Sequence, residues 1–131
     1  MKHWCSVMLP MVAFLTSVGI AQEQAAMKVD EIVVCTSIVD RHPVGADSVF
    51  APDVKQLSCF TRLTNPADMA QVSHVWFYKD KQMTKVDLGV KGKTWRTWST
   101  KTISPEWKGD WRVEVQDSAG SVLSTVSFQI K

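Results

Sequence analysis

In the last third of the chain, large apolar residues alternate with polar ones, and this period of two restricts the fold more than any other feature of the sequence. Over residues 111–116, Trp and Val side chains alternate with Arg, Glu and Gln. Successive side chains of a β-strand point to opposite faces, so the pattern predicts a strand with one buried face. The turn residues 117–120 follow, and the alternating run 122–130 completes a predicted β-hairpin.

Similar strand patterns recur at short intervals before this hairpin. They cover residues 32–39, 54–63, 72–79, 86–90 and 94–102. Outside the first residues, no stretch has helical periodicity. We therefore expect an all-β domain of about seven strands, an antiparallel β-sandwich that is immunoglobulin-like in outline. Its core is expected to include Trp76 and Trp111, which share the phase of neighbouring apolar residues.

The start of the chain has the pattern of an export signal. A basic start at Lys2 precedes an uncharged run from Trp4 to Gln22 that contains small residues at Gly19 and Ala21. This predicts a signal peptide over residues 1–21, cleaved after Ala21. An uncleaved membrane anchor is the alternative. Cleavage implies a periplasmic or secreted protein that has no membrane association afterwards.

The remaining residues have the length of one domain. Residues 22–30 are polar and alanine-rich, which predicts a flexible N-terminal arm, and residues 31–131 then form a single β-sandwich domain. The formal net charge of +2 gives no reason to expect a nucleic-acid partner. The segment 79–96 is rich in lysine, which is typical of a solvated strand edge.

Signal cleavage would leave Cys35 and Cys59 as the cysteines of the mature chain. Disulfides persist in exported proteins, and a bridge between these residues would stabilise the fold by roughly 3.5 kcal/mol on the chain-entropy model. Both cysteines lie in strand-like runs, and neighbouring strands bring Cα atoms into bonding range. We therefore predict a disulfide, with two buried free thiols as the alternative.

The sequence lacks the motifs of common catalytic and metal sites. Gly-x-Ser-x-Gly and Ser-x-x-Lys are missing, and the histidines and cysteines have none of the close spacings of a metal site. We expect no catalytic residue, no metal, no cofactor and no enzymatic activity. His74 is kept as a candidate binding residue. An enzymatic role would require His74 to lie beside an acidic or thiol group in a cleft.

Aromatic and basic residues remain as candidates for binding. Trp95 and Trp98 point to opposite faces of their predicted strand, and Arg96 shares the face of Trp98 and could stack on its ring. Trp107 lies in a predicted loop. If Trp98 and Trp107 are both exposed, they would form a platform for a sugar ring beside Lys101. The alternative is that Trp107 covers the core as part of a loop.

The ordered motif Trp-Arg-Thr-Trp-Ser at residues 95–99, with residues 74–78 and 109–120, resembles a bacterial family catalogued as domain of unknown function 2914. The resemblance extends over most of the chain from Arg41 onward. It implies a bacterial origin, an envelope location and a β-rich domain without a described activity. No catalytic residue is carried over from the family.

These observations lead to two hypotheses for function. The first is an exported, non-enzymatic domain that binds another cell-envelope protein through a sheet edge or the surface around Trp98. The second is a module that binds carbohydrate or peptidoglycan through exposed tryptophans. The sequence leaves the partner, the biological process and the oligomeric state open.

Overall fold

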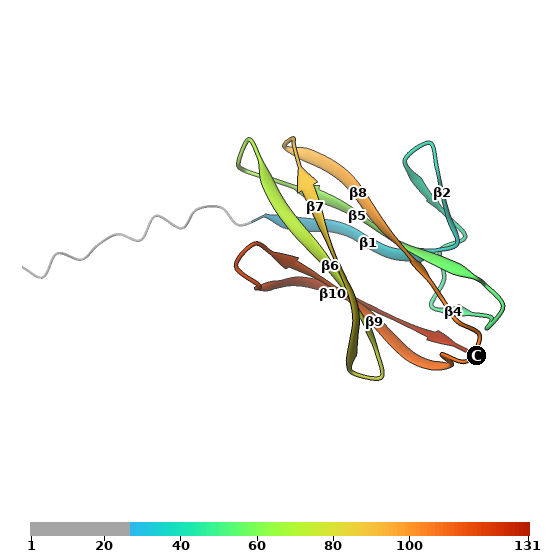
Figure 1. Cartoon of the computed structure of the whole chain (residues 1–131). Helices are drawn as coiled ribbons and strands as arrows, with labels where there is room; N and C mark the ends of the chain where they lie inside the picture. Colours follow the sequence, from blue (N-terminus) through green and yellow to red (C-terminus); the bar gives the residue numbers. More distant parts are fainter. Residues whose placement is uncertain (1–26) are drawn as a thin grey trace, which may run out of the picture.

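Two β-sheets packed face to face make up the computed structural model, which describes residues 27–131 (Figure 1). The larger sheet has the strand order β4-β10-β9-β6-β7 and the smaller the order β1-β5-β8, while β2 and β3 form a separate hairpin. The strands are β1 (Lys28–Cys35), β2 (Ser37–Val39), β3 (His42–Val44), β4 (Val49–Phe50), β5 (Gln56–Thr64), β6 (Ala70–Tyr78), β7 (Lys81–Val90), β8 (Thr94–Thr102), β9 (Gly109–Asp117) and β10 (Val122–Ile130). Apart from the short parallel pair β4–β10, the strand pairs are antiparallel.

The predicted all-β sandwich is confirmed for the described part of the chain. That part contains no helix with the length and apolar character needed to cross a membrane. The predicted signal peptide, residues 1–21, lies outside the described residues, and so do residues 22–26 of the predicted arm. The predicted arm extends too far, because residues 28–30 belong to strand β1. This strand begins at Lys28, which pairs with Thr64 of β5.

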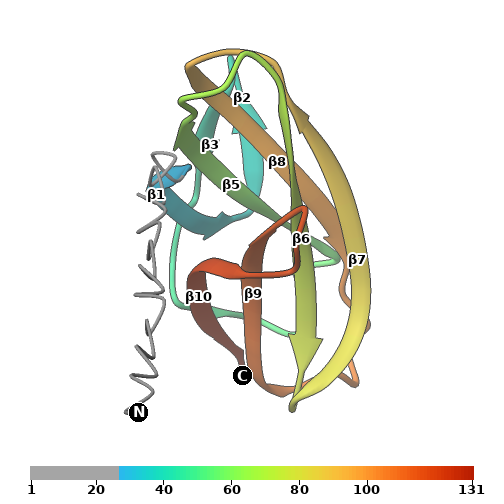
Figure 2. The same ribbon diagram turned by 90° about the vertical axis from the view of Figure 1, so that its left-hand side faces the viewer.

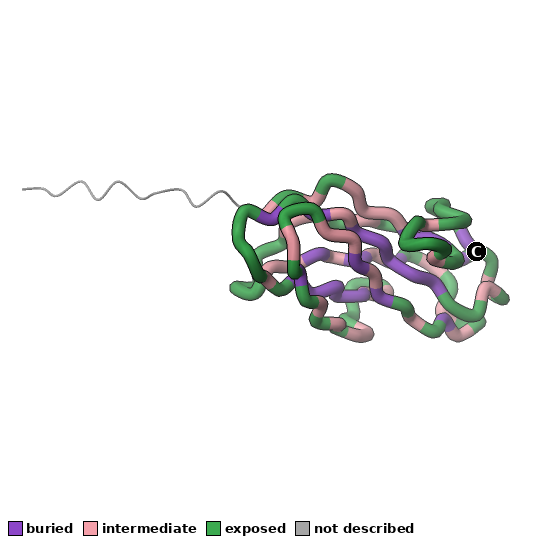
Figure 3. The backbone as a smooth tube through the Cα atoms, turned by 90° about the horizontal axis from the view of Figure 1, so that it is seen from above, coloured by how far each residue is buried: buried purple, intermediate pink, exposed green. Residues whose placement is uncertain are grey.

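The core lies between the facing sheets, where the alternating side chains meet. Buried segments run through the middles of the strands, and exposed segments gather at the turns (Figure 3). Trp76 and Trp111 are 0% and 2% exposed, as the sequence pattern predicts. The ring of Phe128 packs edge-on against Trp76 and is stacked with Trp111, with centroids 6.2 and 5.8 Å away. The larger sheet thus contributes a continuous aromatic layer to the core.

The structure divides the predicted strand 32–39 into two elements. The chain leaves the smaller sheet at Thr36, whose hydroxyl donates to the carbonyl of Val44 and whose N–H donates to that of Gly45. The hairpin β2–β3 then folds over the outer face of the smaller sheet and contacts β5 (Figure 2). As a result the outward-facing Phe60 of β5 is only 1% exposed. This hairpin and the short β4 account for the strands that the sequence patterns missed.

Two tight turns share an unusual backbone. Asp40 and Arg41 join β2 to β3, and Lys79 and Asp80 join β6 to β7; all four have φ between 47° and 65°. Two-residue hairpin loops of this left-handed kind match the twist of the flanking strands. They usually contain Asn or Gly, because a larger side chain is strained there. The second turn begins one residue earlier than the sequence pattern indicated.

The predicted disulfide between Cys35 and Cys59 is not present: both residues are buried free thiols. The register of β1 and β5 explains this result. Val34 lies opposite Cys59, and Cys35 lies opposite Ser58. The two cysteines are therefore offset by one position, and their side chains point to opposite faces of the same sheet. Neighbouring strands bring the backbones close, as expected, but the pleat separates the directions of the two side chains.

Burial raises the pKa of both thiols, and the neighbouring Cys35 adds to the increase at Cys59. Because the thiolate is the reactive form, both should be inert in the folded protein. In a chain with Cys5→Ser, iodoacetamide should modify neither residue under native conditions. After unfolding in guanidinium without reductant, both should be modified, as read by mass spectrometry. An unmodified unfolded chain would show that the disulfide forms after all.

Candidate functional site

His74 lies at the centre of a hydrogen-bonded cluster between the two sheets. Its side chain projects inward from β6 of the larger sheet and is 0% exposed. Nε2 lies 2.8 Å from the hydroxyl of Thr61 on β5, and Nδ1 lies 2.7 Å from the hydroxyl of Ser99 on β8. The indole N–H of Trp76 also donates to the Ser99 hydroxyl, at 3.0 Å. The cluster therefore connects three strands across the interior of the sandwich.

The donors in this cluster favour one tautomer of His74, in which the Ser99 hydroxyl and the imidazole ring each donate to an acceptor within the cluster. The Trp76 indole nitrogen can only donate, so the Ser99 oxygen accepts that bond. The Ser99 hydroxyl hydrogen is then free to donate to Nδ1 of His74, and the imidazole carries its hydrogen on Nε2 and donates to Thr61. This arrangement gives every ring nitrogen a partner while His74 stays neutral. Burial lowers the pKa of His74 to about 4, which also favours the neutral form.

This cluster does not provide the cleft that an enzymatic role for His74 would require. Its neighbours are hydroxyl groups rather than an acid or a thiol, and solvent does not reach the ring. Among the described residues, no group of three or more His, Cys, Asp or Glu side chains is placed to hold a metal ion. His74, a candidate binding residue in the sequence, is instead part of the core.

Two grooves on the surface of the described domain are candidates for a binding site. The larger, about 650 Å³, is bordered by the β6–β7 turn and by the outward faces of β9 and β10. Most of its charged side chains have partners: Arg112 contacts Asp80, the Gln129 amide donates to Asp110 at 2.8 Å, and the Lys79 ammonium lies over the Tyr78 ring. The groove therefore presents little unsatisfied charge to a ligand.

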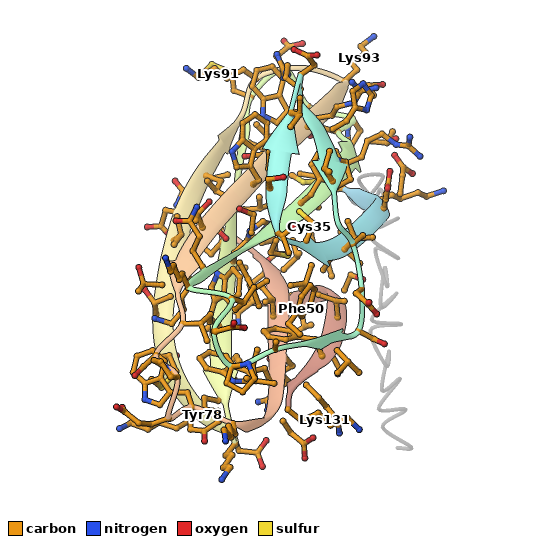
Figure 4. The ribbon with its side chains drawn as sticks, turned by 90° about the vertical axis from the view of Figure 1, so that its right-hand side faces the viewer. Cys35, Phe50, Tyr78, Lys91, Lys93 and Lys131 are labelled. Atoms are coloured by element: carbon orange, nitrogen blue, oxygen red, sulfur yellow. The ribbon has the colours of Figure 1, made fainter. Side chains whose placement is uncertain are left out.

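The smaller groove, about 460 Å³, differs in its chemistry. It lies where the edge strands β7 and β8 of the two sheets approach each other beside the β2–β3 turn, and we call it the basic-aromatic groove. Its lining residues are Arg41, Gly89, Lys91, Trp95, Arg96, Thr97 and Trp98. Three of them are cationic and two are tryptophans. Figure 4 shows Lys91 and Lys93 at this end of the sandwich, away from the end that contains Tyr78 and Lys131.

The strained β2–β3 turn positions Arg41 in this groove. From its left-handed backbone, the Arg41 guanidinium lies 5.7 Å from the centre of the Trp95 ring, which is close enough for a cation–π contact. The Arg96 guanidinium lies 3.4 Å from Nε2 of His42, the next residue of the hairpin. The hairpin therefore forms one wall of the groove, and β8 forms its floor.

Arg96 also lies directly opposite Arg62 of β5 on the outward face of the smaller sheet. Like charges at directly opposite positions destabilise a sheet. Glu31 of β1 lies 3.7 Å from Arg62 and offsets one of the two charges. Within residues 27–131, no carboxylate lies within ion-pair distance of Arg41, Lys91 or Arg96. The groove thus has a local excess of positive charge.

The other sequence candidates lie elsewhere in the fold. Trp107 packs against Trp111, with ring centres 6.0 Å apart, and its carbonyl accepts the indole hydrogen of Trp111. Lys101 projects inward from the far end of β8, and its ammonium group lies 5.3 Å from the centre of the Trp107 ring. Trp107 therefore covers the core, and the structure does not bring Trp98 and Trp107 together as a platform.

Arg96 and Trp98 of this groove were candidate binding residues from the sequence alone, whereas Arg41, Lys91 and Trp95 were not recognised as part of a site. Trp95 points inward and packs against the second part of the core, yet one side of its ring reaches the groove. Arg41 lies between the predicted strands 32–39 and 54–63, in a segment for which no strand was predicted. The two-residue spacing between β-branched Val39 and the following His42 was the available signal for a hairpin.

The family model described as "Protein of unknown function (DUF2914)" matches residues 69–130, which cover β6 to β10. The resemblance noted in the sequence is thereby confirmed for this part of the chain. The match begins at Met69, so the earlier segments from Arg41 to Thr61 lie outside it. No curated protein matches the chain.

Similar folds occur within solved structures of glycosidases. A β-glucosidase of family GH3 from Bifidobacterium adolescentis is 11% identical with a TM-score of 0.46, and the match covers 80% of this chain and 17% of that one. A β-glucosidase from Kluyveromyces marxianus in complex with glucose is 10% identical with a TM-score of 0.45, covering 80% and 14%. The chain thus spans less than a fifth of the length of these proteins. Likeness at this level carries no information about activity.

The buried His74 should make stability depend on pH. Its pKa is about 4 in the folded protein and near 6.5 in the unfolded chain, so only the unfolded chain binds the proton between these values. Stability is therefore retained above pH 6.5 and falls as the pH decreases towards 4, by up to roughly 3 kcal/mol from this residue. Urea unfolding across this range measures the loss. His74→Gln is the control, and an equal pH slope in the variant would contradict the prediction.

Proposed function

We propose that this protein is an exported, non-enzymatic domain that binds another cell-envelope protein through the basic-aromatic groove. The observation that carries the proposal is the combination of three cations and two tryptophans in one groove of the described domain. Arginine and tryptophan are enriched among the residues that dominate protein–protein binding energy. A groove of this composition favours a partner segment that presents carboxylates and apolar side chains together.

The distribution of charge supports this choice of site over the larger groove. Arg41, Lys91 and Arg96 have no carboxylate within ion-pair distance in residues 27–131, whereas Arg112 in the larger groove contacts Asp80. An acidic partner would offset the repulsion between Arg96 and Arg62 on the outward face of the smaller sheet. Binding would therefore reduce an unfavourable charge interaction that remains in the folded domain. Unfavourable arrangements of this kind are typical of functional surfaces.

Two further observations bear on the alternatives. The histidine that an enzymatic role would need is enclosed in the core and hydrogen-bonded to hydroxyl groups. The glycan hypothesis rested on a platform of Trp98 and Trp107, and these rings lie in different parts of the fold. Binding of a protein segment to the groove requires neither feature. The export that the proposal assumes rests on the sequence of residues 1–21.

Cross-linking of the tagged full-length chain in bacterial cells tests this function. The double variant Arg96→Ala, Trp98→Ala should reduce the yield of a specific cross-linked partner by more than about tenfold, since central Arg and Trp residues each contribute on the order of 2 kcal/mol to binding. Lys85→Ala, an exposed cation of β7 outside the groove, is the matched control and should leave the yield unchanged. Equal yields from all three chains would exclude the groove as the binding site.

A further inference from the structure

We propose that the partner segment binds as an added β-strand along the free edge of β8, and that this segment is extended and acidic. The inference rests on the proposed function and specifies its binding mode and ligand class. The backbone of β8 would supply hydrogen bonds, and Arg96, Trp98 and Lys101 would select the sequence. Strand addition of this kind uses main-chain groups for affinity and side chains for specificity.

The free edge of β8 follows from the strand order. The smaller sheet has the order β1-β5-β8, so β8 pairs with β5 on one side and with no strand of the described domain on the other. β7 and β8 approach each other at the turn that joins them and separate towards the C-terminal end of β8 (Figure 1). The edge therefore becomes more open beyond the groove.

The hydrogen bonds at both ends of β8 show which of its residues face this edge. The N–H of Asn65 donates to Lys93, and the N–H of Ile103 donates to Lys55, each across the register that pairs β5 with β8. In an antiparallel pair, every second residue exchanges bonds with its opposite residue. The odd-numbered residues 95–101 therefore bond to β5. The backbone groups of the even-numbered residues 94–102 point to the free edge.

Arg96 and Trp98 thus present both backbone and side chain to an incoming strand. Their side chains lie on the outward face, because they are opposite Arg62 and Phe60 of β5. A residue of the added strand that lies directly opposite Arg96 would place its side chain beside the guanidinium. A carboxylate at this position would pair with the Arg96 guanidinium. An apolar residue two positions further along the added strand would pack against Trp98.

Lys101, near the C-terminal end of β8, places a second requirement on the sequence of the added strand. It lies opposite Leu57 on the inward face and is partly withdrawn from solvent, which lowers its pKa. An inward-pointing lysine on an edge strand hinders pairing with an unsuitable strand, because its charge would be buried without a partner. A carboxylate opposite Lys101 removes that penalty. The lysine therefore selects for an acidic residue five positions from the first one.

The charges also identify the occupant as a different chain. If β8 of a second copy paired with this edge, Arg96 and Lys101 of both copies would come together, with Arg41 and Lys91 of each copy nearby. Like charges in such proximity oppose association. An acidic segment has the complementary charge. The side-chain positions predict the pattern acidic-x-apolar-x-x-acidic for a parallel strand and its reverse for an antiparallel one.

A synthetic peptide that contains Glu-Thr-Val-Val-Thr-Glu fits both orientations and serves as the probe. In the full-length protein, NMR hydrogen exchange should show slow amides at Trp95, Thr97 and Ser99 and fast amides at Arg96 and Trp98. Saturating peptide should slow the exchange at Arg96 and Trp98 by at least about tenfold. A peptide with Lys in place of both Glu residues should leave the exchange unchanged.

A proline at the edge provides the matched variant. The amide of Thr100 points to the free edge, so Thr100→Pro removes a donor for the added strand without removing a bond to β5. It should abolish peptide binding. Thr100→Ala, which loses the same 2.8 Å contact with the Ser58 hydroxyl, should retain it.

The outcomes separate this inference from the proposed function. Peptide binding without slowed exchange at Arg96 and Trp98 would show that the groove binds side chains only, which overturns strand addition and leaves the proposed function in place. Failure of the acidic peptide to bind, or equal binding of the lysine peptide, would overturn the acidic strand as ligand. Equal cross-linking yields from the unchanged chain, the Arg96→Ala, Trp98→Ala variant and the Lys85→Ala control would overturn the proposed function itself.

Discussion

The hydrogen bonds of His74 hold the two sheets in one relative position, and the rest of the structure depends on that position. Hydrophobic contacts between sheets tolerate small shifts, because apolar packing has little directional preference. The bonds from His74 to Thr61 and Ser99, and from Trp76 to Ser99, have defined lengths and directions. They cross from the middle of the larger sheet to two strands of the smaller one. A buried polar cluster in which every member has a partner favours a single arrangement of the core.

This arrangement places the edge of β8 beside the end of β7. Trp95 packs into the interior near this edge, and its position follows that of Thr97 and Ser99 on the same face of β8. The outward-facing residues Arg96 and Trp98 then form the floor of the groove. The β2–β3 hairpin adds Arg41 through a turn that few arginines adopt. The groove is thus assembled from segments that are distant in sequence and held by the core.

The period of two along the strands predicted most of the core from the sequence. Trp76, Trp111 and the residues in phase with them are buried as expected, because alternation is a direct consequence of the pleat. The same reasoning predicted that Cys35 and Cys59 lie on neighbouring strands. It could not predict their register, and a shift of one residue decides whether two side chains share a face.

The candidate site was less predictable for the same kind of reason. Arg96 and Trp98 were recognisable because they belong to one strand and share one face. Arg41 occupies a left-handed turn position that glycine usually fills, so the residue pattern there did not indicate a tight hairpin turn. The contact between Trp107 and Trp111 depends on how a loop returns to the core. Such loop contacts have no periodic signal in a sequence.

A double-mutant cycle between Trp76→Phe and Ser99→Ala tests most directly whether the buried cluster fixes the sheets. Both substitutions remove a member of the same hydrogen bond, across the interior from one sheet to the other. If the cluster acts as a unit, urea unfolding of the four chains should give a coupling energy of about 1 kcal/mol or more. Destabilisations that add without coupling would contradict the account, because they would show that the sheets are held by apolar packing alone.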